Sequence, residues 1–484
     1  MTDPAITPIE RRFTQADQLR FARLSGDFNP MHMDALAARR TQPGAPVVHG
    51  VHAVLWALDR LAAEADFTAL SNITVSLNRF TYLDRRVECR ITSRNASAMS
   101  VEVVADGVVT IVIRLKFAAR GAASAQDAFA GLAPADMTCA IEEPEGLRGA
   151  EGWLTPADGA SEMAAAFPAL TRAIGVERVT GLALLSTLVG MACPGLHSIF
   201  TAFQADLLDG VPARPGIGFR VRIADPRFRV VRMAVGGAGI AATVSAFVRM
   251  PPMPVTGMAT LVDLVAADEF AGRRVLVVGG SRGLGALSAR MIAAGGGEVV
   301  ITYARGAADA GEVAADIGAF RGKAACVVHP LDVSRDLAPQ LAGIEGVFTD
   351  LLYFATPSIR RQKNAVFVPA LHQEFFQCYV LAFAELTALL LARDPEAKLG
   401  VLYPSSVAVV ERPEEMTEYA MAKAAGEVLA ADLAVANPRL NMVIDRLGRL
   451  PTDQNATVVQ AEFEDPITTM LPLLRRTLGR PEGL

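Results

Sequence analysis

The pattern of apolar residues changes once along this chain of 484 residues, at the proline-rich stretch Met250-Pro251-Pro252-Met253-Pro254. Before it, apolar residues often alternate with polar ones, which is typical of strands with one buried face. After it, apolar strands alternate with helical stretches, which favours a parallel sheet with helices on both faces. The strands are expected at 275–278, 299–301, 325–328, 351–354, 399–403 and 442–444. The sequence therefore predicts an antiparallel α+β region joined by a linker to a doubly wound α/β domain.

The region before the linker predicts the same order of elements twice, a helix and then antiparallel strands. The first set comprises a helix at 50–65, strands near 73–77 and 87–91, and a hairpin that turns at Asp106-Gly107. The second set comprises a helix at 180–192, strands near 196–207 and 219–223, and a hairpin over 228–248 that turns at Gly236-Gly237. We therefore expect three modules, at residues 1–125, 126–255 and 256–484.

Composition excludes several classes of protein. The formal net charge is −5 and the chain has no run of Lys or Arg, which argues against nucleic-acid and membrane-surface partners. Five cysteines lie far apart without a CxxC pair, so we expect no metal site and a reducing compartment. The amino terminus has no basic region leading into an apolar stretch, which favours a cytoplasmic protein. Residues 179–205 carry no charge, but Pro194-Gly195 interrupts them, so we expect a buried helix and a strand rather than a membrane span.

A short polar motif precedes the first predicted helix. Residues 25–32 read Ser-Gly-Asp-Phe-Asn-Pro-Met-His, and His49-Gly50 follows. Addition of water to a conjugated double bond needs proton acceptors and donors, and N–H groups that stabilise an enolate oxygen. Asp27 and His32 on a loop stiffened by Pro30 can handle the protons, with Asn29 as an orienting group, and the Gly50 N–H at a helix start can meet the oxygen. The alternative is an ordinary Asp/Asn turn, with His52 as a packing or pocket residue.

The SGDFNPMH motif followed by VHG resembles the R-specific enoyl-CoA hydratases of the MaoC-like group, which have the hot-dog fold. The resemblance implies that Asp27, Asn29 and His32 surround a catalytic water. It also implies a double hot-dog with one competent and one degenerate half. The second half has no equivalent motif, and its single histidine, His197, is expected to be structural or to line the pocket.

A glycine-rich turn opens the last module. Residues 275–285 deliver Gly279, Gly283 and Gly285 from an apolar strand into a helix start, where backbone N–H groups can approach a pyrophosphate. The next strand ends without the acidic residue that would bind a free ribose 2′-hydroxyl. Arg282 and Arg305 can instead pair with a 2′-phosphate, which favours NADP(H) over NAD(H), unless either arginine only caps a surface helix.

Three later residues form a candidate proton-transfer group. Tyr419 and Lys423 lie four residues apart on one helix face, where an ammonium can stabilise a phenolate. Ser406 follows an apolar strand, at the carboxyl edge of the sheet where such folds bind ligands. We expect Ser406 to hydrogen-bond a substrate carbonyl and Tyr419 to exchange a proton with it.

The glycine-rich turn with Ser406, Tyr419 and Lys423 resembles the short-chain dehydrogenase/reductase family over about 220 residues. The chain departs from the family pattern at Val278 for Thr, at Phe354-Ala355-Thr356 for Asn-Ala-Gly, and at 377–380, where Gln-Cys-Tyr-Val lacks the proton-relay asparagine. The resemblance places Asp332 near the adenine. The residues expected to hold the cofactor are Gly279, Ser281, Arg282, Gly283, Leu284, Gly285, Arg305, Asp332, Val333, Ala355, Tyr419 and Lys423.

The two resemblances share a 3-hydroxyacyl thioester as intermediate. The leading hypothesis is a bifunctional enzyme, an NADPH-dependent 3-oxoacyl reductase and an R-specific 3-hydroxyacyl dehydratase or enoyl hydratase. Its expected substrates are acyl-CoA or acyl-carrier-protein thioesters. Alternatives are a reductase of a thioester, sugar or polyketide carbonyl with a non-catalytic thioester-binding or dimerising hot-dog region, and a scaffold that has lost turnover. A homo-oligomer is expected, because both folds commonly associate through apolar faces.

Overall fold

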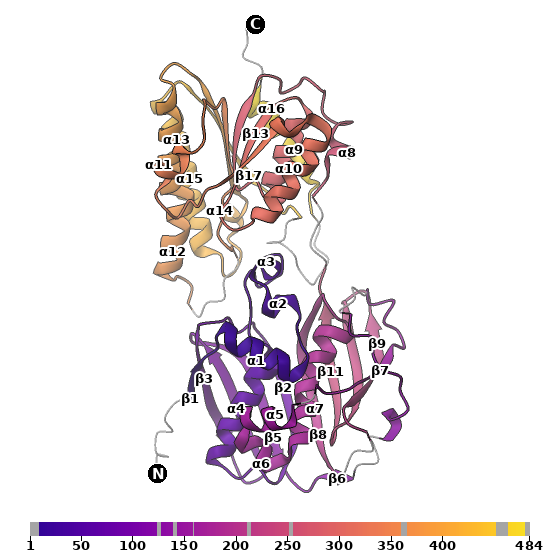
Figure 1. The fold of residues 1–484 in the computed structure, drawn as a ribbon. Coiled ribbons are helices and arrows are strands. Elements are labelled where there is room, and N and C mark those ends of the chain that lie inside the picture. Colours follow the sequence, from indigo (N-terminus) through magenta and orange to yellow (C-terminus); the bar gives the residue numbers. More distant parts are fainter. Residues whose placement is uncertain are drawn as a thin grey trace. The chain divides into compact units, whose positions relative to one another are not determined.

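The computed structural model describes residues 9–122, 127–138, 143–157, 159–210, 214–250, 255–359, 365–451 and 463–479. The chain divides into two compact units, of which the first ends at Pro251 and the second starts at Pro252. Figure 1 shows both units, and each is described here by itself.

One antiparallel sheet forms the body of the first unit. Its order over the described residues is β1-β3-β4-β5-β2-β8-β11-β10-β9-β7, with β6 beside β8 in parallel. The strands are β1 (Ile9–Arg12), β2 (Leu70–Leu77), β3 (Arg86–Arg94), β4 (Ala98–Ala105), β5 (Val108–Phe117), β6 (Gly121–Ala122), β7 (Glu151–Leu154), β8 (Ser198–Asp209), β9 (Ile217–Asp225), β10 (Val230–Gly237) and β11 (Ile240–Val248). The order β3-β4-β5-β2 repeats as β9-β10-β11-β8, and the antiparallel pair β2–β8 joins the two halves. The predicted double hot-dog fold is confirmed.

Apart from the two shortest, α2 and α3, the helices of the first unit pack on one face of this sheet (Figure 1). Each half has one central apolar helix, α4 or α7, and the two share a single hydrophobic core. The helices are α1 (Gln15–Ser25), α2 (Pro30–Met33), α3 (Ala35–Ala38), α4 (Gly50–Glu64), α5 (Ala160–Ala166), α6 (Pro168–Ile174) and α7 (Val176–Thr187), which a π-helix (Leu188–Ala192) and a cis Cys193–Pro194 bond follow. The uncharged segment 179–205 is thus a buried helix followed by β8, as predicted.

One predicted turn is wrong. Gly236 and Gly237 are the last residues of β10, and the hairpin turns at Ala238-Gly239, whose φ angles are +50° and +73°. Pairing of Gly237 with Ile240 leaves these two residues as the loop, and positive φ at both central positions is what a type I′ turn requires. Gly237 is glycine for another reason, because a Cβ there would overlap the carbonyl oxygen of Gly216.

The second unit is a doubly wound parallel sheet. Its described strands lie in the order β14-β13-β12-β15-β16-β17 and all neighbouring pairs are parallel. From the centre of the sheet, the chain builds outward from β12 to β14 on one side and then from β15 to β17 on the other. The strands are β12 (Arg274–Val278), β13 (Glu298–Tyr303), β14 (Cys326–Pro330), β15 (Asp350–Tyr353), β16 (Leu399–Ser406) and β17 (Leu440–Leu447), and each one overlaps a predicted strand. This order brings the carboxyl ends of β12 and β15 together at a crevice that suits a ligand.

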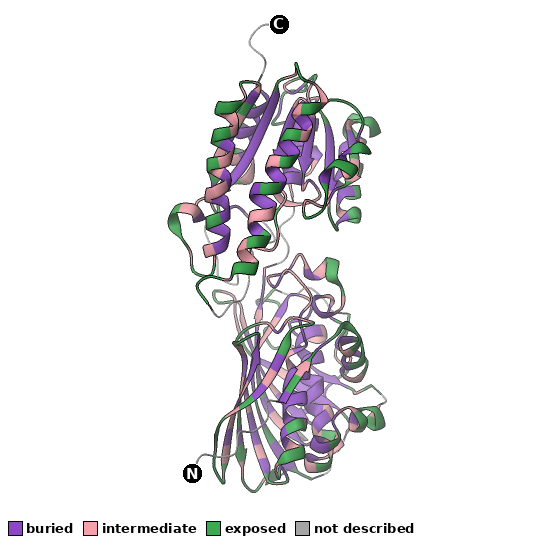
Figure 2. Ribbon diagram, turned by 90° about the vertical axis from the view of Figure 1, so that its left-hand side faces the viewer, coloured by how far each residue is buried: buried purple, intermediate pink, exposed green. Residues whose placement is uncertain are grey.

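Helices cover both faces of the parallel sheet (Figure 1). One face carries α8 (Met258–Leu261), α9 (Gly283–Ala294), α10 (Ala307–Arg321) and α16 (Pro466–Leu478). The other carries α11 (Leu337–Ala342), α13 (Ala382–Arg393) and α15 (Thr417–Ala436), with α12 (Pro369–Phe376), a π-helix (Gln377–Leu381) and α14 (Ala408–Glu411) near the carboxyl edge. Figure 2 shows the strands buried and the outward sides of the helices exposed.

One continuous helical stretch, Pro369–Arg393, is long and apolar enough to cross a bilayer by length and composition alone. Half of its most apolar window is buried inside the second unit, where it packs against α15. The pair Pro168–Ile174 and Val176–Ala192 passes the same test only as one span, and it is bent by 116°. Core helices of globular domains have this composition too.

Candidate active sites

The motif at residues 25–32 forms a tight connection between two helices. α1 ends at Gly26, whose φ is +88°, and Asp27 follows directly. The Asn29 side chain accepts a hydrogen bond from the Met31 N–H (3.0 Å) and so caps α2, of which Pro30 is the first residue. His32 therefore lies on a single helical turn and not on a loop, because Asn29 and Pro30 together start a helix there.

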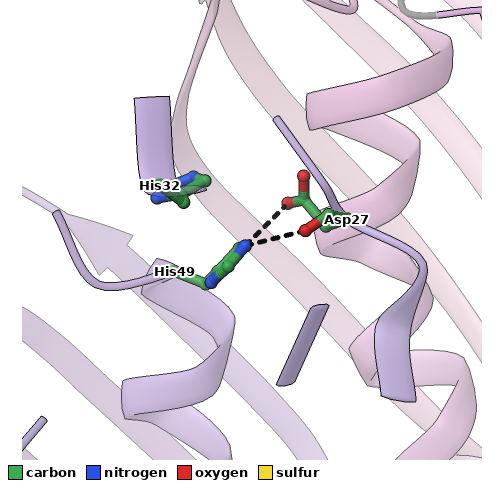
Figure 3. Close-up of side chains that lie close together, drawn as sticks. All are labelled: Asp27, His32 and His49. Carbon is green, nitrogen blue, oxygen red and sulfur yellow. Dashed lines mark hydrogen bonds and ion pairs between the residues drawn. The ribbon is translucent and has the colours of Figure 1, made fainter. Parts of the chain in front are cut away.

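Asp27, His32 and His49 face one another at the end of α4 (Figure 3). One ligand-type atom from each lies within 4.8 Å of the others, and all three side chains are buried. His32 Nδ1 donates to the Val47 carbonyl (2.8 Å), which leaves Nε2 as the ring nitrogen without a recorded hydrogen bond among the described residues. His49 Nε2 donates to the Asp27 carbonyl (3.0 Å), so His49 Nδ1 accepts from Gln18 Nε2 (3.1 Å).

This network also contains Gln18, which no motif marks. Its buried amide nitrogen donates both to His49 and to the Val47 carbonyl (2.9 Å). The Val47 carbonyl therefore accepts hydrogen bonds from both His32 and Gln18. Both ring nitrogens of His49 are thereby engaged inside the protein. A metal ion on the three residues would displace one of these bonds, and the absence of a metal stays a prediction.

Burial sets the charges of this group. Burial raises the pKa of Asp27, against the opposite effects of His32, of the Ser186 hydroxyl and of the Asn29 N–H. Burial, with His32 and His52 as further contributions, holds the pKa of His49 well below its usual value, so His49 stays neutral. The buried Asp27 carboxyl close to the His32 imidazole suits general acid–base chemistry.

The second half of the sheet supplies part of this site. Ser186, on α7, donates to Asp27 Oδ2 (2.6 Å), and the Asn29 amide donates to the Gly190 carbonyl in the π-helix (2.8 Å). A Cβ on Gly190 would lie 2.5 Å from Asp27 Oδ1, so only glycine fits beside the carboxyl. Sequence reasoning missed Ser186 and Gly190, which lie about 160 residues from Asp27 and carry no motif.

A cavity of about 480 Å³ opens beside these residues. Asp27, Asn29, His32 and Gly50 all line it, so the structure brings the four predicted residues of this site together. Among the described residues the Gly50 N–H, the first of α4, has no acceptor. The apolar lining comes from both halves and includes Leu77, Ile111, Val189, Ile199, Phe200 and Phe247.

Two other histidines lie outside the lining of this cavity. His52 stacks on Phe21 at a centroid distance of 4.6 Å, and burial lowers its pKa to about 3, which agrees with a packing role. His197 is buried, and its ring nitrogens have no hydrogen-bond partner within the described ranges. Burial lowers the pKa of His197 to about 4, so its ring is neutral near pH 7, and its structural role stays a prediction.

The glycine-rich turn of the second unit has the tight geometry that a phosphate site requires. Gly279 has φ +81°, and a Cβ there would lie 2.9 Å from the Ala355 nitrogen. Gly283, with φ +55°, is the first residue of α9 after Ser281 and the N-cap Arg282, and Leu284 packs on the core. A Cβ on Gly285 would overlap the Gly279 carbonyl oxygen. The turn therefore lets a ligand approach the N-terminus of α9.

The ends of β13 and β14 place Arg305 near Asp332. Burial raises the pKa of Asp332, but hydrogen bonds from Ser334, and Arg335 and Arg305 beyond them, outweigh burial and lower it. The Asp332 carboxylate accepts from the Ser334 N–H (3.0 Å) and hydroxyl (2.7 Å). Arg305 is exposed, so its guanidinium remains accessible to an anion.

Ser406, Tyr419 and Lys423 meet at the carboxyl edge of the sheet. Burial raises the pKa of Tyr419, while a hydrogen bond with Ser406 lowers it. The Lys423 ammonium donates to the Pro404 carbonyl (2.7 Å) and lies 4.0 Å from the centre of the Tyr379 ring. The recorded contacts of the ammonium are thus with Pro404 and Tyr379, and its stabilisation of a Tyr419 phenolate stays a prediction.

The segments that depart from the family pattern contact each other. The Tyr379 hydroxyl hydrogen-bonds Thr356, and Cys378 Sγ donates to the Ala355 carbonyl (3.6 Å). Val333 and Ala355 pack on the buried cluster that contains Tyr379 and Tyr419. Two of the predicted cofactor residues, Val333 and Ala355, thus lie beside Tyr419. Sequence reasoning missed the contact between Tyr379 and Lys423.

Comparison with known families agrees with both parts of the chain. Residues 2–110 match the MaoC like domain, and residues 273–444 match the short chain dehydrogenase family. Uncharacterized oxidoreductases of Mycobacterium bovis and Mycobacterium tuberculosis are each 32% identical over 204 residues, which is 40% of this chain and 59% of theirs. The match therefore spans less than two thirds of those relatives.

Among solved structures, the oxidoreductase yciK from E. coli is 21% identical, with a TM-score of 0.40, over 48% of this chain and 94% of that one. A short chain dehydrogenase from Escherichia coli CFT073, complexed with NADPH, is 22% identical, with a TM-score of 0.39, over 44% of this chain and 93% of that one. The MaoC-like match lies in the unit that contains the antiparallel sheet, and the dehydrogenase match lies in the unit that contains the parallel sheet. The chain joins an N-terminal MaoC-like region of double hot-dog fold to a C-terminal short-chain dehydrogenase domain.

Proposed function

We propose that the chain is a bifunctional acyl-thioester enzyme, in which the first unit interconverts 2-enoyl and (R)-3-hydroxyacyl thioesters and the second reduces 3-oxoacyl thioesters with NADPH. The observation that carries the first activity is the buried Asp27–His32 pair on the same cavity as the Gly50 N–H. The proposal for the second rests on Ser406, Tyr419 and Lys423 at the edge of a sheet that also presents a glycine-rich turn.

In hydration, a water molecule adds to C3 of the enoyl thioester while His32 Nε2 takes one of its protons. The Asp27 carboxyl, whose pKa burial raises, gives a proton to C2. The charge that develops on the thioester oxygen meets the Gly50 N–H at the positive end of α4. Return of a proton from His32 to Asp27 restores the starting state, and dehydration reverses these transfers.

The residues of the second unit fit a nicotinamide dinucleotide. A Cβ on Gly279 or Gly285 would overlap backbone atoms of the protein, so glycine at both positions permits the tight turn that presents the N-terminus of α9 to a pyrophosphate. β13 ends at Tyr303, and Ala304 and Arg305 follow it, so the end of this strand carries no acidic residue of its own, and Arg305 and Arg282 favour the additional phosphate of NADP(H). When bound, this cofactor supplies the hydride for the carbonyl carbon.

The chain's own residues supply the proton of the reduction. Ser406 orients the substrate carbonyl oxygen, and the Tyr419 hydroxyl donates its proton to that oxygen as the carbonyl carbon is reduced. The Lys423 ammonium lies on the same face of α15 and stabilises the phenolate that remains. The product, a 3-hydroxyacyl thioester, is the substrate that the first unit dehydrates, so the two sites share one intermediate.

Separate assays of the full chain test both activities. Wild-type protein should hydrate crotonyl-CoA and should oxidise NADPH with acetoacetyl-CoA. Asp27→Asn should lower kcat/KM for hydration by at least about 100-fold and leave reduction intact, while Tyr419→Phe should do the reverse. Each variant is thus the control for the other. Active reduction without hydration of any enoyl thioester would mean that the hot-dog region only binds thioesters or mediates assembly.

The remaining predictions concern the surroundings of the enzyme. We infer these from the sequence alone. The thiol is coenzyme A or a carrier protein, the chain assembles into a homo-oligomer, and the location is cytoplasmic, without nucleic-acid or membrane partners.

A further inference from the structure

The Lys423 ammonium is a buried charge without a carboxylate partner. Its side chain is 6% exposed, and among the described residues no Asp or Glu lies within ion-pair distance of it. Its recorded hydrogen bond goes to the Pro404 carbonyl (2.7 Å). Two aromatic rings complete its surroundings, Tyr379 with its centre 4.0 Å from Nζ and Tyr403 at 5.1 Å. The ring faces therefore provide stabilisation that a carboxylate would provide elsewhere.

Tyr379 is held in place by several contacts. It lies in the π-helix between α12 and α13, where Tyr353 donates to the Cys378 carbonyl (2.6 Å) and Tyr403 to the Tyr379 carbonyl (3.1 Å). A π-helix often marks a functional position because it re-aims one side chain. The Tyr379 hydroxyl bonds Thr356, which orients the ring. The side chain is completely buried.

The Tyr379 ring contacts both members of the proton-transfer pair. The Lys423 ammonium lies over the face of this ring. The rings of Tyr379 and Tyr419 form a T-shaped pair, with centroids 5.7 Å apart and an interplanar angle of 80°. We propose that Tyr379 is a positioning residue of the reductase site, whose ring face holds the Lys423 ammonium charged and next to Tyr419. This proposal rests on the proposed reductase roles of those two residues.

The groups around Lys423 determine what removal of the ring should do. Burial lowers the pKa of Lys423 to about 8, against the opposite effects of Cys378, on the π-helix, and of Glu427, on α15. The other titratable neighbours are Tyr403 on β16 and Tyr419 on α15. Loss of a desolvated cation–π contact disfavours the ammonium further. The titration midpoint of Lys423 should then fall by roughly 1 pH unit.

NMR of the full chain with ¹³C-labelled lysine measures this midpoint directly. The chain has only five lysines, and Lys423→Ala assigns the signal of interest. We expect Lys423 to titrate near 8 in the wild type. Tyr379→Leu and the unbranched Tyr379→Met should each lower the midpoint. Tyr379→Phe, which keeps the ring and loses only the bond to Thr356, should leave it within a few tenths. Phe383→Leu removes another buried ring of the same helical stretch and should not move it.

An unchanged midpoint in the Leu and Met variants would overturn the proposal, as would an equal fall in Tyr379→Phe or Phe383→Leu. The activity arm is the pH dependence of kcat/KM for NADPH oxidation with acetoacetyl-CoA. Its alkaline limb should move to lower pH in Tyr379→Leu, because the ammonium is lost earlier, whereas a purely structural role would lower activity equally at all pH values. Absence of any wild-type reduction would refute the proposed function, but the NMR result does not depend on turnover.

Discussion

Asp350 gives the sharpest stability prediction for the second unit. It is the first residue of β15 and is completely buried. Its Oδ2 accepts from Thr349 (2.7 Å) with Arg273 at 3.8 Å, while Oδ1 has no partner within the described residues. Burial raises the pKa of Asp350 to about 6, despite the opposite effects of Thr349 and Arg273.

The sign of the pH effect follows from this direction. The folded protein binds the proton more tightly than the unfolded chain, whose Asp pKa is about 3.9. The contribution of Asp350 to stability is therefore complete below about pH 4 and is lost as the pH rises through 6. Above pH 7 the ionised side chain costs about 3 kcal/mol, from roughly 2 pKa units at 1.36 kcal/mol each.

Asp350→Asn removes this ionisation. The variant should therefore gain about 2 kcal/mol of stability relative to the wild type between pH 4 and pH 8. Urea denaturation followed by far-UV circular dichroism measures it. Tryptophan fluorescence reports the first unit separately, because Trp56 and Trp153 both lie there. The exposed Asp432→Asn is the matched control. An effect of Asp350→Asn that is the same at both pH values would refute the reasoning.

Three further predictions concern the sites. Ser186→Ala removes a hydrogen bond that lowers the pKa of Asp27, so the limb of the hydration pH profile governed by Asp27 should move to higher pH, with kcat/KM reduced about tenfold. An unmoved limb would contradict this prediction. The control is Thr171→Val, which removes a buried hydroxyl elsewhere in the same half. Gly190→Ala places a Cβ against the Asp27 carboxyl and should lower hydration at least about 100-fold in an enoyl-CoA assay with reduction unchanged; wild-type hydration would refute the predicted clash. Arg305→Asp should raise KM for NADPH at least about tenfold and not that for NADH, measured by initial rates; equal changes for both would remove Arg305 from the 2′-phosphate site.

Local patterns determined much of this fold. The alternation of apolar residues, the Asp106-Gly107 turn and the glycine-rich turn after β12 each act over a few residues, so the sequence alone predicted the repeat and the six parallel strands. The same holds for Asp27, Asn29, His32 and Gly50, which lie in two short segments. The predicted turn at Gly236-Gly237 was wrong because Gly237 is required by its close approach to Gly216, the residue before the neighbouring strand β9.

Only the tertiary structure decided which residues complete the two sites. Ser186 and Gly190 reach Asp27 because β2 and β8 pair and bring the C-terminal end of α7 beside the N-terminal end of α4. Tyr379 reaches Lys423 because a π-helix, held by tyrosines of two strands, re-aims its ring. Such contacts join residues far apart in the chain, and their energies arise from burial and packing that no local pattern encodes.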